Sequence, residues 1–270
     1  MKRFISKNIP ILSILLIGGI GVQTFTSCSS DDDNGSSGGG SFPSISSGEQ
    51  FNPNITYGSL ADSRDNKTYR TVAIGTQVWM AENLNYDIPD NDTDLCYNNE
   101  PSNCAIYGRL YDWATAMALD QSCNESECAN QAVDKHRGVC PEEWHIPSDA
   151  EWNILEKYVD PNWVSSNMNN VAGTKLKAKI GWNWDLYLET YGNGTDDYGF
   201  SALPGGVIFP DGNNYGLSYA GYWWSATEEY EISGSLDSYK RSAGSNTSNL
   251  HGNRGSKTSL LSIRCVKDSN

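Results

Sequence analysis

Alternation of apolar and polar residues predicts a β-hairpin early in the globular part of the chain. Thr68–Ile74 has the alternation and the residue types of a half-buried strand, and Gln77–Met80 returns as a second one. The two residues between them, Gly75 and Thr76, fit a tight turn with glycine in its first position. We therefore predict two paired antiparallel strands over these ranges.

Helical periodicity occurs twice after this hairpin. The first segment predicts an amphipathic helix of about three turns, with its apolar face made by Leu110, Trp113, Ala114 and Met117. The second helix opens with a capping box of Ser148 and Glu151 and stops at Asp160-Pro161. Its apolar face consists of Trp152, Leu155, Tyr158 and Val159.

Short strand-like pieces dominate the C-terminal part of the chain. They cover Gly206–Phe209, Tyr222–Ala226, Ser238–Ser242 and Leu260–Val266, and a turn is predicted at Pro210-Asp211-Gly212. Helices early and antiparallel strands late, with long irregular stretches between them, predict an α+β domain. The 9 Trp and 15 Tyr indicate a core filled by large aromatic side chains. Of Trp223 and Trp224, adjacent on one strand, at most one should face outward.

The N-terminus has the three parts of a bacterial lipoprotein signal. A basic start is followed by an apolar run from Ile9 to Val22 and then by Phe25-Thr26-Ser27-Cys28. The apolar run is shorter than the roughly 20 residues that a membrane-spanning helix needs. We predict a signal peptide over residues 1–27 and lipidation of the Cys28 thiol, which would anchor the chain to a membrane.

Residues 28–50 are predicted to form an export signal and a tether. Ser29–Asp33 resembles the acidic signal that sends Bacteroidetes lipoproteins to the outer face of the outer membrane, and the rest is a flexible Ser- and Gly-rich segment. From residue 51 to 270 the composition is globular, without a second linker or a repeat, so we predict one domain there.

The charge of the chain argues against one class of partner. The formal net charge is −14, and it becomes −17 once the three cations of residues 1–27 are removed. A surface this acidic repels the phosphates of nucleic acid, so we predict no nucleic-acid partner.

Six cysteines remain once the lipidated one is set aside, and an even number in an exported protein indicates disulfides. Of about fifteen possible pairings, proximity favours Cys96–Cys104 and Cys123–Cys128, which leaves Cys140–Cys265. A metal site is the alternative, because His136 and His145 flank Cys140. An oxidising compartment and the lack of a tight Cys-x-x-Cys pair weigh against zinc.

Several phrases of the sequence resemble the Fibrobacter succinogenes major paralogous domain, a family found on many secreted Bacteroidetes and Fibrobacter proteins. In chain order they are Asp62–Tyr69, Ile74–Tyr86, Tyr107–Tyr111, Cys140–Pro141, Trp144–Trp152, Asp197–Gly206, Tyr222–Thr227 and Ile263–Val266. The resemblance runs from about Tyr57 to Lys267. It implies a surface domain without implying an activity.

The family is similar to the C-type-lectin-like folds. This similarity implies an irregular, loop-rich single domain with antiparallel strands, two to three helices and disulfides. Those folds tie the region of an early helix to the final strand, which here implies the Cys140–Cys265 bond, worth roughly 4–5 kcal/mol by the chain-entropy model. Their calcium-binding tripeptide has no counterpart, because Glu100-Pro101-Ser102-Asn103 lies too early and no Trp-Asn-Asp exists. Calcium-dependent sugar binding by that site is therefore not predicted.

Lectin-like folds place ligands in their loop-rich part, where this chain concentrates aromatic and acidic residues. The residues that we predict for ligand binding are Trp182, Trp184, Asp185, Tyr187, Asp196, Asp197 and Tyr198. Exposed aromatic rings stack on sugar rings, and carboxylates accept hydrogen bonds from sugar hydroxyls. The alternative is that these aromatics form the core of a domain with few strands.

An acidic loop is the other candidate for ligand binding. Asp90, Asp92 and Asp94 alternate with polar residues as in a calcium loop, but an EF-hand needs Gly and Glu where this chain has Leu95 and Pro101. We interpret the segment as a solvated acidic loop, and we predict neither a metal nor another cofactor.

Sequence signatures of enzymes are missing. The chain has no His-Glu-x-x-His, no Gly-x-Ser-x-Gly and no phosphate-binding glycine loop, and His145 is interpreted as a structural, hydrogen-bonded residue. We predict a non-catalytic module that binds glycans or host surface molecules. A structural or adhesive component that binds another surface protein is the alternative. A glycosidase with two carboxylates, which need only spatial proximity, is the third possibility.

Overall fold

The computed structural model describes residues 45–46, 48–132, 134–164, 170–185, 190–229 and 237–268, and of residues 184, 185, 190 and 191 it describes the backbone. These residues belong to one compact unit, Ser41–Asn270. Ile45 and Gln50, which were predicted to lie in the tether, are buried, so packing begins before residue 51. None of the described helices is long and apolar enough to cross a membrane. The predicted signal peptide and Cys28 lie outside the described residues.

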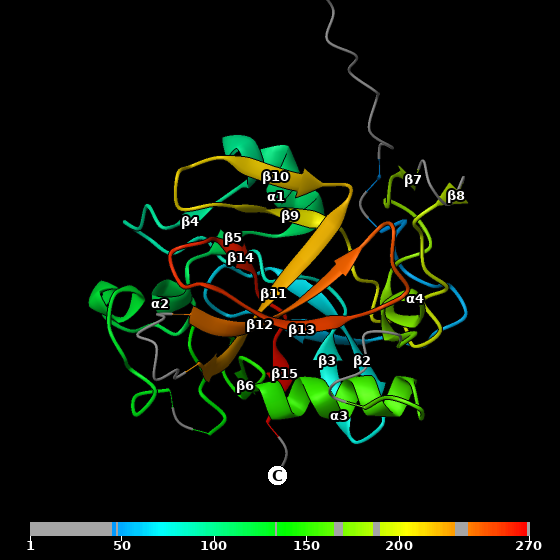
Figure 1. The fold of residues 1–270 in the computed structure, drawn as a ribbon, viewed down its shortest axis with the longest axis horizontal. Helices are drawn as coiled ribbons and strands as arrows, with labels where there is room; N and C mark the ends of the chain where they lie inside the picture. The colour runs from blue at the N-terminus through cyan, green and yellow to red at the C-terminus, as the bar shows by residue number, and fades with distance from the viewer. Residues whose placement is uncertain are drawn as a thin grey trace, which may run out of the picture. The chain divides into compact units, whose positions relative to one another are not determined.

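The first sheet contains five strands in the order β1-β2-β3-β15-β6. Its strands are β1 (Gly58–Ala61), β2 (Thr68–Ile74), β3 (Gln77–Met80), β15 (Val266–Lys267) and β6 (Trp144–His145). The predicted hairpin is confirmed with its bounds, and Val72 pairs with Trp79. The last strand, β15, lies between β3 and β6, so the C-terminal end of the chain joins two segments that are distant in sequence (Figure 1).

The second sheet contains eight strands, arranged around one long strand, β11. In chain order they are β4 (Asp94–Leu95), β5 (Leu110–Tyr111), β9 (Gly205–Ile208), β10 (Asn214–Leu217), β11 (Ala220–Glu228), β12 (Asp237–Gly244), β13 (His251–Ser256) and β14 (Leu261–Ser262). The pairing is mostly antiparallel, although β11 forms parallel bridges with β9 and β14. A separate two-stranded ribbon pairs β7 (Trp184–Asp185) with β8 (Thr190–Tyr191).

Three of the four predicted C-terminal strands are confirmed as β9, β11 and β12. The fourth prediction, a single strand over Leu260–Val266, is wrong. The chain changes sheets within that segment, because β14 pairs with β5 and β11 whereas β15 pairs with β3 and β6.

The described residues form four α-helices, where two to three were predicted. They are α1 (Pro101–Tyr107), α2 (Trp113–Ala116), α3 (Asp149–Val159) and α4 (Ala172–Leu176), with 3₁₀ turns η1 (Tyr97–Asn99) and η2 (Gln121–Asn124). The predicted capping box of α3 is confirmed, and Asp160 ends the helix. The predicted three-turn helix at Leu110 is wrong. Leu110 pairs with two strands, and the Asp112 carboxylate accepts the Thr115 N–H at 2.8 Å, so α2 begins only at Trp113.

Large aromatic residues fill the interior, as the composition predicts. One hydrophobic cluster contains Tyr111, Trp113, Trp144, Trp224 and Ile263, among others. A second contains Trp79, Trp152, Trp182, Phe200 and Trp223, and the rings of Trp79, Trp152 and Phe200 pack with centroids 4.8–6.1 Å apart. Both adjacent tryptophans of β11 are fully buried, which agrees with the prediction that at most one faces outward.

All three predicted disulfides are present. They join Cys96 to Cys104, Cys123 to Cys128 and Cys140 to Cys265. The Cys140–Cys265 bond lies shortly before β6 at one end and directly before β15 at the other. It therefore links covalently two segments whose strands pair in the first sheet.

Candidate functional site

A groove of about 850 Å³ lies where η1, β10, β11 and β12 meet. This volume is in the range of sites for small organic ligands. We call it the tyrosine groove, and its lining residues are Tyr97, Asn98, Asn214, Tyr215, Gly216, Leu217, Tyr219, Ala220, Tyr222, Ser242, Ala243, Gly244, Ser245, Asn246, Thr247 and His251. Tyr215 and Tyr219 are 61% and 48% exposed, whereas Tyr97 is only 8% exposed. The groove therefore offers accessible aromatic rings and one nearly buried ring.

The β9–β10 hairpin brings Tyr215 to the groove. Its turn is closed by the Phe209 N–H, which donates to the Asn213 carbonyl at 2.9 Å, near the predicted Pro210–Gly212 turn. On β9, Gly206 has a φ of +71°, and a Cβ there would lie 2.6 Å from the Tyr97 ring. Glycine is therefore required where the hairpin passes Tyr97.

The opposite wall is a short loop that a disulfide closes. Cys96 and Cys104 bracket Tyr97 and Asn98, and Asn98 adopts a positive φ of 57°. The backbone N–H of Asn98 donates to Asn214 Oδ1 at 2.9 Å, which ties this loop to β10. Asparagine tolerates the left-handed conformation better than most residues, so the sequence suits the turn. The disulfide and the hydrogen bond together hold the two walls in register.

Burial shifts the pKa of three titratable groups in the groove. Burial raises the pKa of Tyr97 and of Tyr222 above the usual value for a phenol. Burial lowers the pKa of His251 below its ordinary 6.5. The nearest amine on β12 belongs to Lys240, whose Nζ lies 4.8 Å from the centre of the Tyr222 ring.

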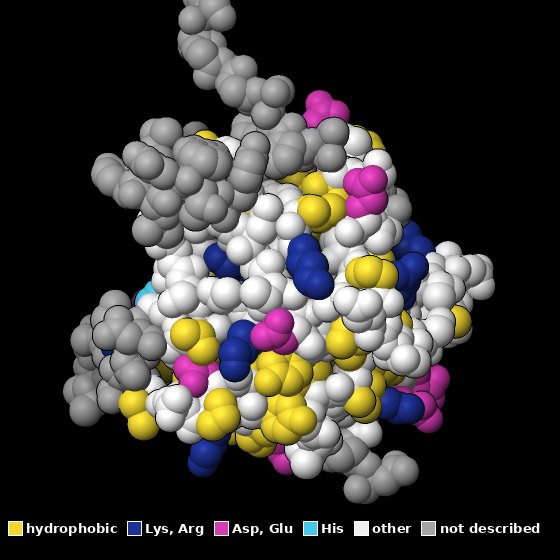
Figure 2. Space-filling model, turned by 90° about the vertical axis from the view of Figure 1, so that its right-hand side faces the viewer, with side chains coloured by type: hydrophobic (Ala, Val, Ile, Leu, Met, Phe, Trp, Pro, Cys, Tyr) yellow, Lys and Arg dark blue, Asp and Glu magenta, His cyan; other side chains and the backbone are white. Residues whose placement is uncertain are grey.

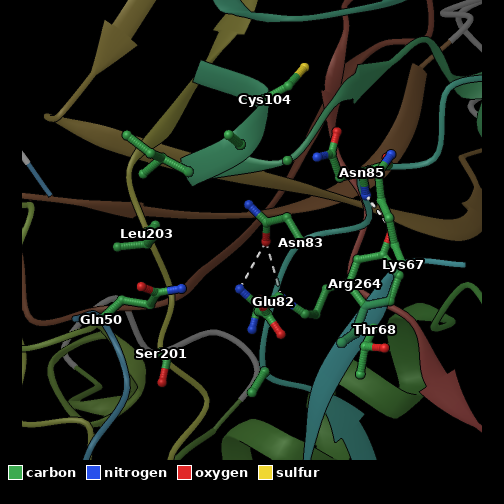
Figure 3. Close-up of a pocket in the computed structure, with 15 residues that line it drawn as sticks. Gln50, Lys67, Thr68, Glu82, Asn83, Asn85, Cys104, Ser201, Leu203 and Arg264 are labelled. Atoms are coloured by element: carbon green, nitrogen blue, oxygen red, sulfur yellow. Dashed lines mark hydrogen bonds between the residues drawn. The ribbon is translucent and has the colours of Figure 1, made fainter. Parts of the chain in front are cut away.

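A second, smaller cavity of about 160 Å³ reaches the buried side chain of Arg264 (Figure 3). The guanidinium donates to Asn83 Oδ1 from Nε at 3.1 Å and from Nη2 at 2.8 Å, and to the carbonyls of Met80 and Phe200. Asn83 also accepts the indole N–H of Trp223 at 2.9 Å. Burial lowers the pKa of Arg264 to about 9. Since these groups bond to one another, they serve the structure by linking Met80 on β3 and Trp223 on β11 to the segments that carry Asn83, Phe200 and Arg264.

The predicted ligand-binding residues whose side chains are described do not line either cavity. Trp182 is fully buried and donates its indole N–H to the Ala202 carbonyl, so its prediction as a stacking surface is wrong. The prediction for Asp196 is also wrong. Its carboxylate is buried, accepts the Ser201 N–H at 2.8 Å, and has its pKa raised by burial to about 6. In both cases the side chain is needed for packing inside the domain.

The remaining predicted residues differ in exposure and in how much of them the structure describes. Asp197 is exposed and Tyr198 is half-buried. Trp184 and Asp185 lie on β7, where only the backbone is described, and Tyr187 lies outside the described residues. Neither Asp197 nor Tyr198 lines the tyrosine groove.

Hydrophobic side chains also reach the surface outside the groove. Ile154 and Tyr158 on α3 are 49% and 52% exposed, and Tyr158 packs edge-to-face on Tyr198 with ring centres 5.8 Å apart. Figure 2 views the side on which α4 lies, and hydrophobic side chains gather in the lower half of that face. Tyr198 therefore belongs to a contact with α3 and not to the groove.

The alternative readings of the cysteines and acids can now be decided. Cys140 is bonded to Cys265, and His145 contacts Glu151 at 2.7 Å and Asp268 at 2.5 Å, which confirms that His145 is hydrogen-bonded. The solvated-loop interpretation is wrong for Asp94, which is buried on β4 and lies 3.5 Å from Arg109. Among the described residues, no group of three or more His, Cys, Asp or Glu side chains could hold a metal ion.

Sequence reasoning missed the tyrosines of the groove. Tyr215 and Tyr219 lie between a predicted turn and a predicted strand, in a stretch rich in Gly, Asn and Ser that lacks strict alternation. The two tyrosines that follow the predicted turn could have indicated the groove. A tyrosine on a hairpin face that does not pack on the core remains exposed.

Comparison with known families places these features in context. A model of the Fibrobacter succinogenes major domain matches residues 72–267, a range that contains the tyrosine groove and all three disulfides. Searches among curated proteins and among solved structures found no significant match. The matched range covers well over half of the sequence, from within β2 to the end of β15. The chain therefore belongs to the Fibrobacter succinogenes major domain family.

Proposed function

We propose that this chain is a surface lipoprotein with a non-catalytic role, and that it binds glycans in the tyrosine groove. The convergence of four tyrosines with three asparagine side chains in one groove carries the proposal. Tyrosine rings offer flat apolar faces for sugar rings, while side-chain amides both donate to and accept from hydroxyl groups.

The placement at the cell surface rests on the sequence of the N-terminus. Cys28 follows a basic and apolar signal, and Asp31, Asp32 and Asp33 follow the cysteine. We propose a lipid anchor on Cys28 in the outer membrane, with the folded domain facing outward. We also propose that the fold is related to C-type-lectin-like folds, since Cys140–Cys265 ties the region before α3 to the final strand.

One observation favours an alternative protein partner. Tyrosine, asparagine, serine and glycine dominate the lining of the groove, and the combining sites of antibodies that bind proteins have the same composition. The alternative function is therefore that of an adhesive or structural component that binds another surface protein through the same groove.

A glycan array tests the first proposal. The full-length chain, purified in detergent, is compared with Tyr215→Ala and Tyr219→Ala, and with Tyr158→Ala as a matched control. Tyr158 is as exposed as the two groove residues, at 52%, but lies on α3. We expect each groove variant to weaken binding by about ten-fold, or about 1.4 kcal/mol, at an unchanged melting temperature.

The outcomes separate the two functions. Equal losses in Tyr158→Ala and Tyr215→Ala would place the ligand site elsewhere. No glycan binding, together with capture of one surface protein that Tyr215→Ala no longer captures, would favour the adhesive role.

A further inference from the structure

The residues that line the tyrosine groove differ in charge from the chain as a whole. Charged residues make up 19% of the whole chain, and acids outnumber bases 33 to 19. Yet the described residues that line the groove include no Asp, Glu, Lys or Arg. Burial lowers the pKa of its one histidine, His251, which favours the neutral imidazole. An uncharged depression within an acidic protein indicates selection among ligands by charge.

The described lining residues also lack the carboxylates that protein calcium sites use. Calcium takes six to eight oxygen ligands, of which Asp and Glu carboxylates are the main protein source. The lining residues that the structure describes supply side-chain amides, hydroxyls and backbone carbonyls as oxygen ligands. Asp94, the buried acid of the segment that resembles a calcium loop, lies on β4 beside Arg109. It does not line the groove.

A charged ligand group would meet no charged side chain among the described lining residues, and the Lys240 amine reaches only the Tyr222 ring at the edge of the lining, 4.8 Å from its centre. Moving an ion out of water into a site without a counter-charge costs several kcal/mol. For an acidic sugar, repulsion by the net charge of −14 adds to this cost. Hydroxyl groups, in contrast, are well matched by Asn98, Asn214 and Asn246, whose amides donate and accept at neighbouring atoms.

We propose that the tyrosine groove recognises uncharged glycans and does so without calcium. This inference rests on the proposed glycan-binding function and specifies the chemical class of its ligand. Sugar rings stack on Tyr215 and Tyr219, and their hydroxyls bond to the amide and hydroxyl side chains of the lining.

The test uses the full-length chain in detergent on an array that pairs each neutral glycan with a sialylated or uronate counterpart. Each pair is probed once with calcium chloride and once with EDTA. We expect neutral glycans to bind at least ten-fold more tightly than their acidic counterparts, with less than a two-fold change on adding EDTA. Loss of binding in EDTA, or preference for the acidic members, would overturn the inference while leaving glycan binding intact. No glycan bound in any arm would overturn the proposed function and this inference together.

A charge-insertion variant provides a second, independent readout. Asn246→Lys places a cation in the groove, so the ratio of acidic to neutral glycan binding should rise several-fold. Asn162→Lys makes the same change at an exposed position after α3, and it should leave the ratio unchanged. If both variants change the ratio equally, the selection arises from the net charge of the protein and not from the groove.

Discussion

Trp223 and Trp224 are neighbours on β11, yet their fully buried side chains belong to different hydrophobic clusters. Successive side chains of a strand point to opposite faces, so β11 supplies one large ring to each cluster. Each indole N–H also has its own acceptor, Asn83 Oδ1 at 2.9 Å for Trp223 and the Tyr111 carbonyl at 2.8 Å for Trp224.

This arrangement predicts independent contributions to stability. Trp223→Phe and Trp224→Phe should each cost about 2–4 kcal/mol, from lost packing and a lost buried hydrogen bond. Because the two rings share no cluster and no acceptor, the double variant should cost the sum of both within about 0.5 kcal/mol. Urea unfolding measures all three, and a coupling above about 1 kcal/mol would mean that the clusters act as one core.

A buried ion pair gives the second prediction. Lys257 is fully buried, lies 4.7 Å from the centre of the Trp113 ring, and donates to the carbonyls of Cys123 and Ser126 and to Glu228. Lys257→Met leaves the Glu228 carboxylate buried without its partner, so we expect a loss of about 3–5 kcal/mol. Adding Glu228→Gln should recover part of it.

The control for this pair is Lys157→Met on the exposed face of α3, which should change stability by less than about 0.5 kcal/mol. Chemical unfolding compares the four proteins. Similar small effects of Lys257→Met and Lys157→Met would contradict a stabilising role for the buried pair.

His145 makes stability depend on pH. Burial by itself lowers the pKa of His145, but hydrogen bonds and attraction from Glu151 and Asp268 raise it above 6.5 overall. The contribution of protonated His145 is therefore complete below pH 6.5 and is lost as pH rises through the raised pKa. Burial raises the pKa of Glu151, but its bonds to His145 and Ser148 lower it below 4.5 overall, so its contribution is present above pH 4.5.

The largest effect of His145→Gln should thus fall between pH 4.5 and 6.5. The difference in melting temperature from the wild type should shrink as pH is raised toward about 9. Thermal scans across this range test it. A difference that stays constant from pH 5 to 9 would show that His145 contributes by packing alone.

The disulfides should differ in their effects on stability and on ligand affinity. Removing Cys140–Cys265, with a sequence separation of 125, should cost about 5 kcal/mol, whereas Cys96–Cys104, with a separation of 8, should cost about 2.5 kcal/mol. Loss of the short one also frees the loop that carries Tyr97, so ligand affinity should fall. Unfolding and binding assays on the paired Cys→Ala variants measure both effects. Unchanged affinity without Cys96–Cys104 would mean that the loop does not shape the groove.

Local signals in the sequence were sufficient for some elements of the fold. The hairpin of β2 and β3 and the capped helix α3 are specified within a dozen residues each, and both were predicted with accurate bounds. The helix predicted at Leu110 was wrong because Leu110 pairs with Leu95 and Ser262, and Ser262 is distant in sequence. Spacing alone cannot reveal such pairing.

The site was harder to predict for the same reason. Trp182 and Tyr215 both occur in glycine-rich segments, but Trp182 packs into a cluster with Phe200 and Trp223, while Tyr215 extends from a hairpin. The groove also requires Asn98 and Asn214 to meet across 116 residues. Aromatic content therefore predicted a core rich in rings and the presence of exposed ones, but not which residues serve each purpose.

The Cys140–Cys265 bond also determines how the protein carries mechanical load. When the chain is pulled from its ends, tension passes through the bond and bypasses the enclosed segment. With a separation of 125 residues, the bond withholds roughly 400–450 Å of extension. Tyr215, Tyr219 and Tyr222 lie inside that segment, while Tyr97 lies outside it. Pulling on the two ends would therefore leave the β10–β11 wall of the groove inside the closed loop, while the strands before Cys140 would be extended.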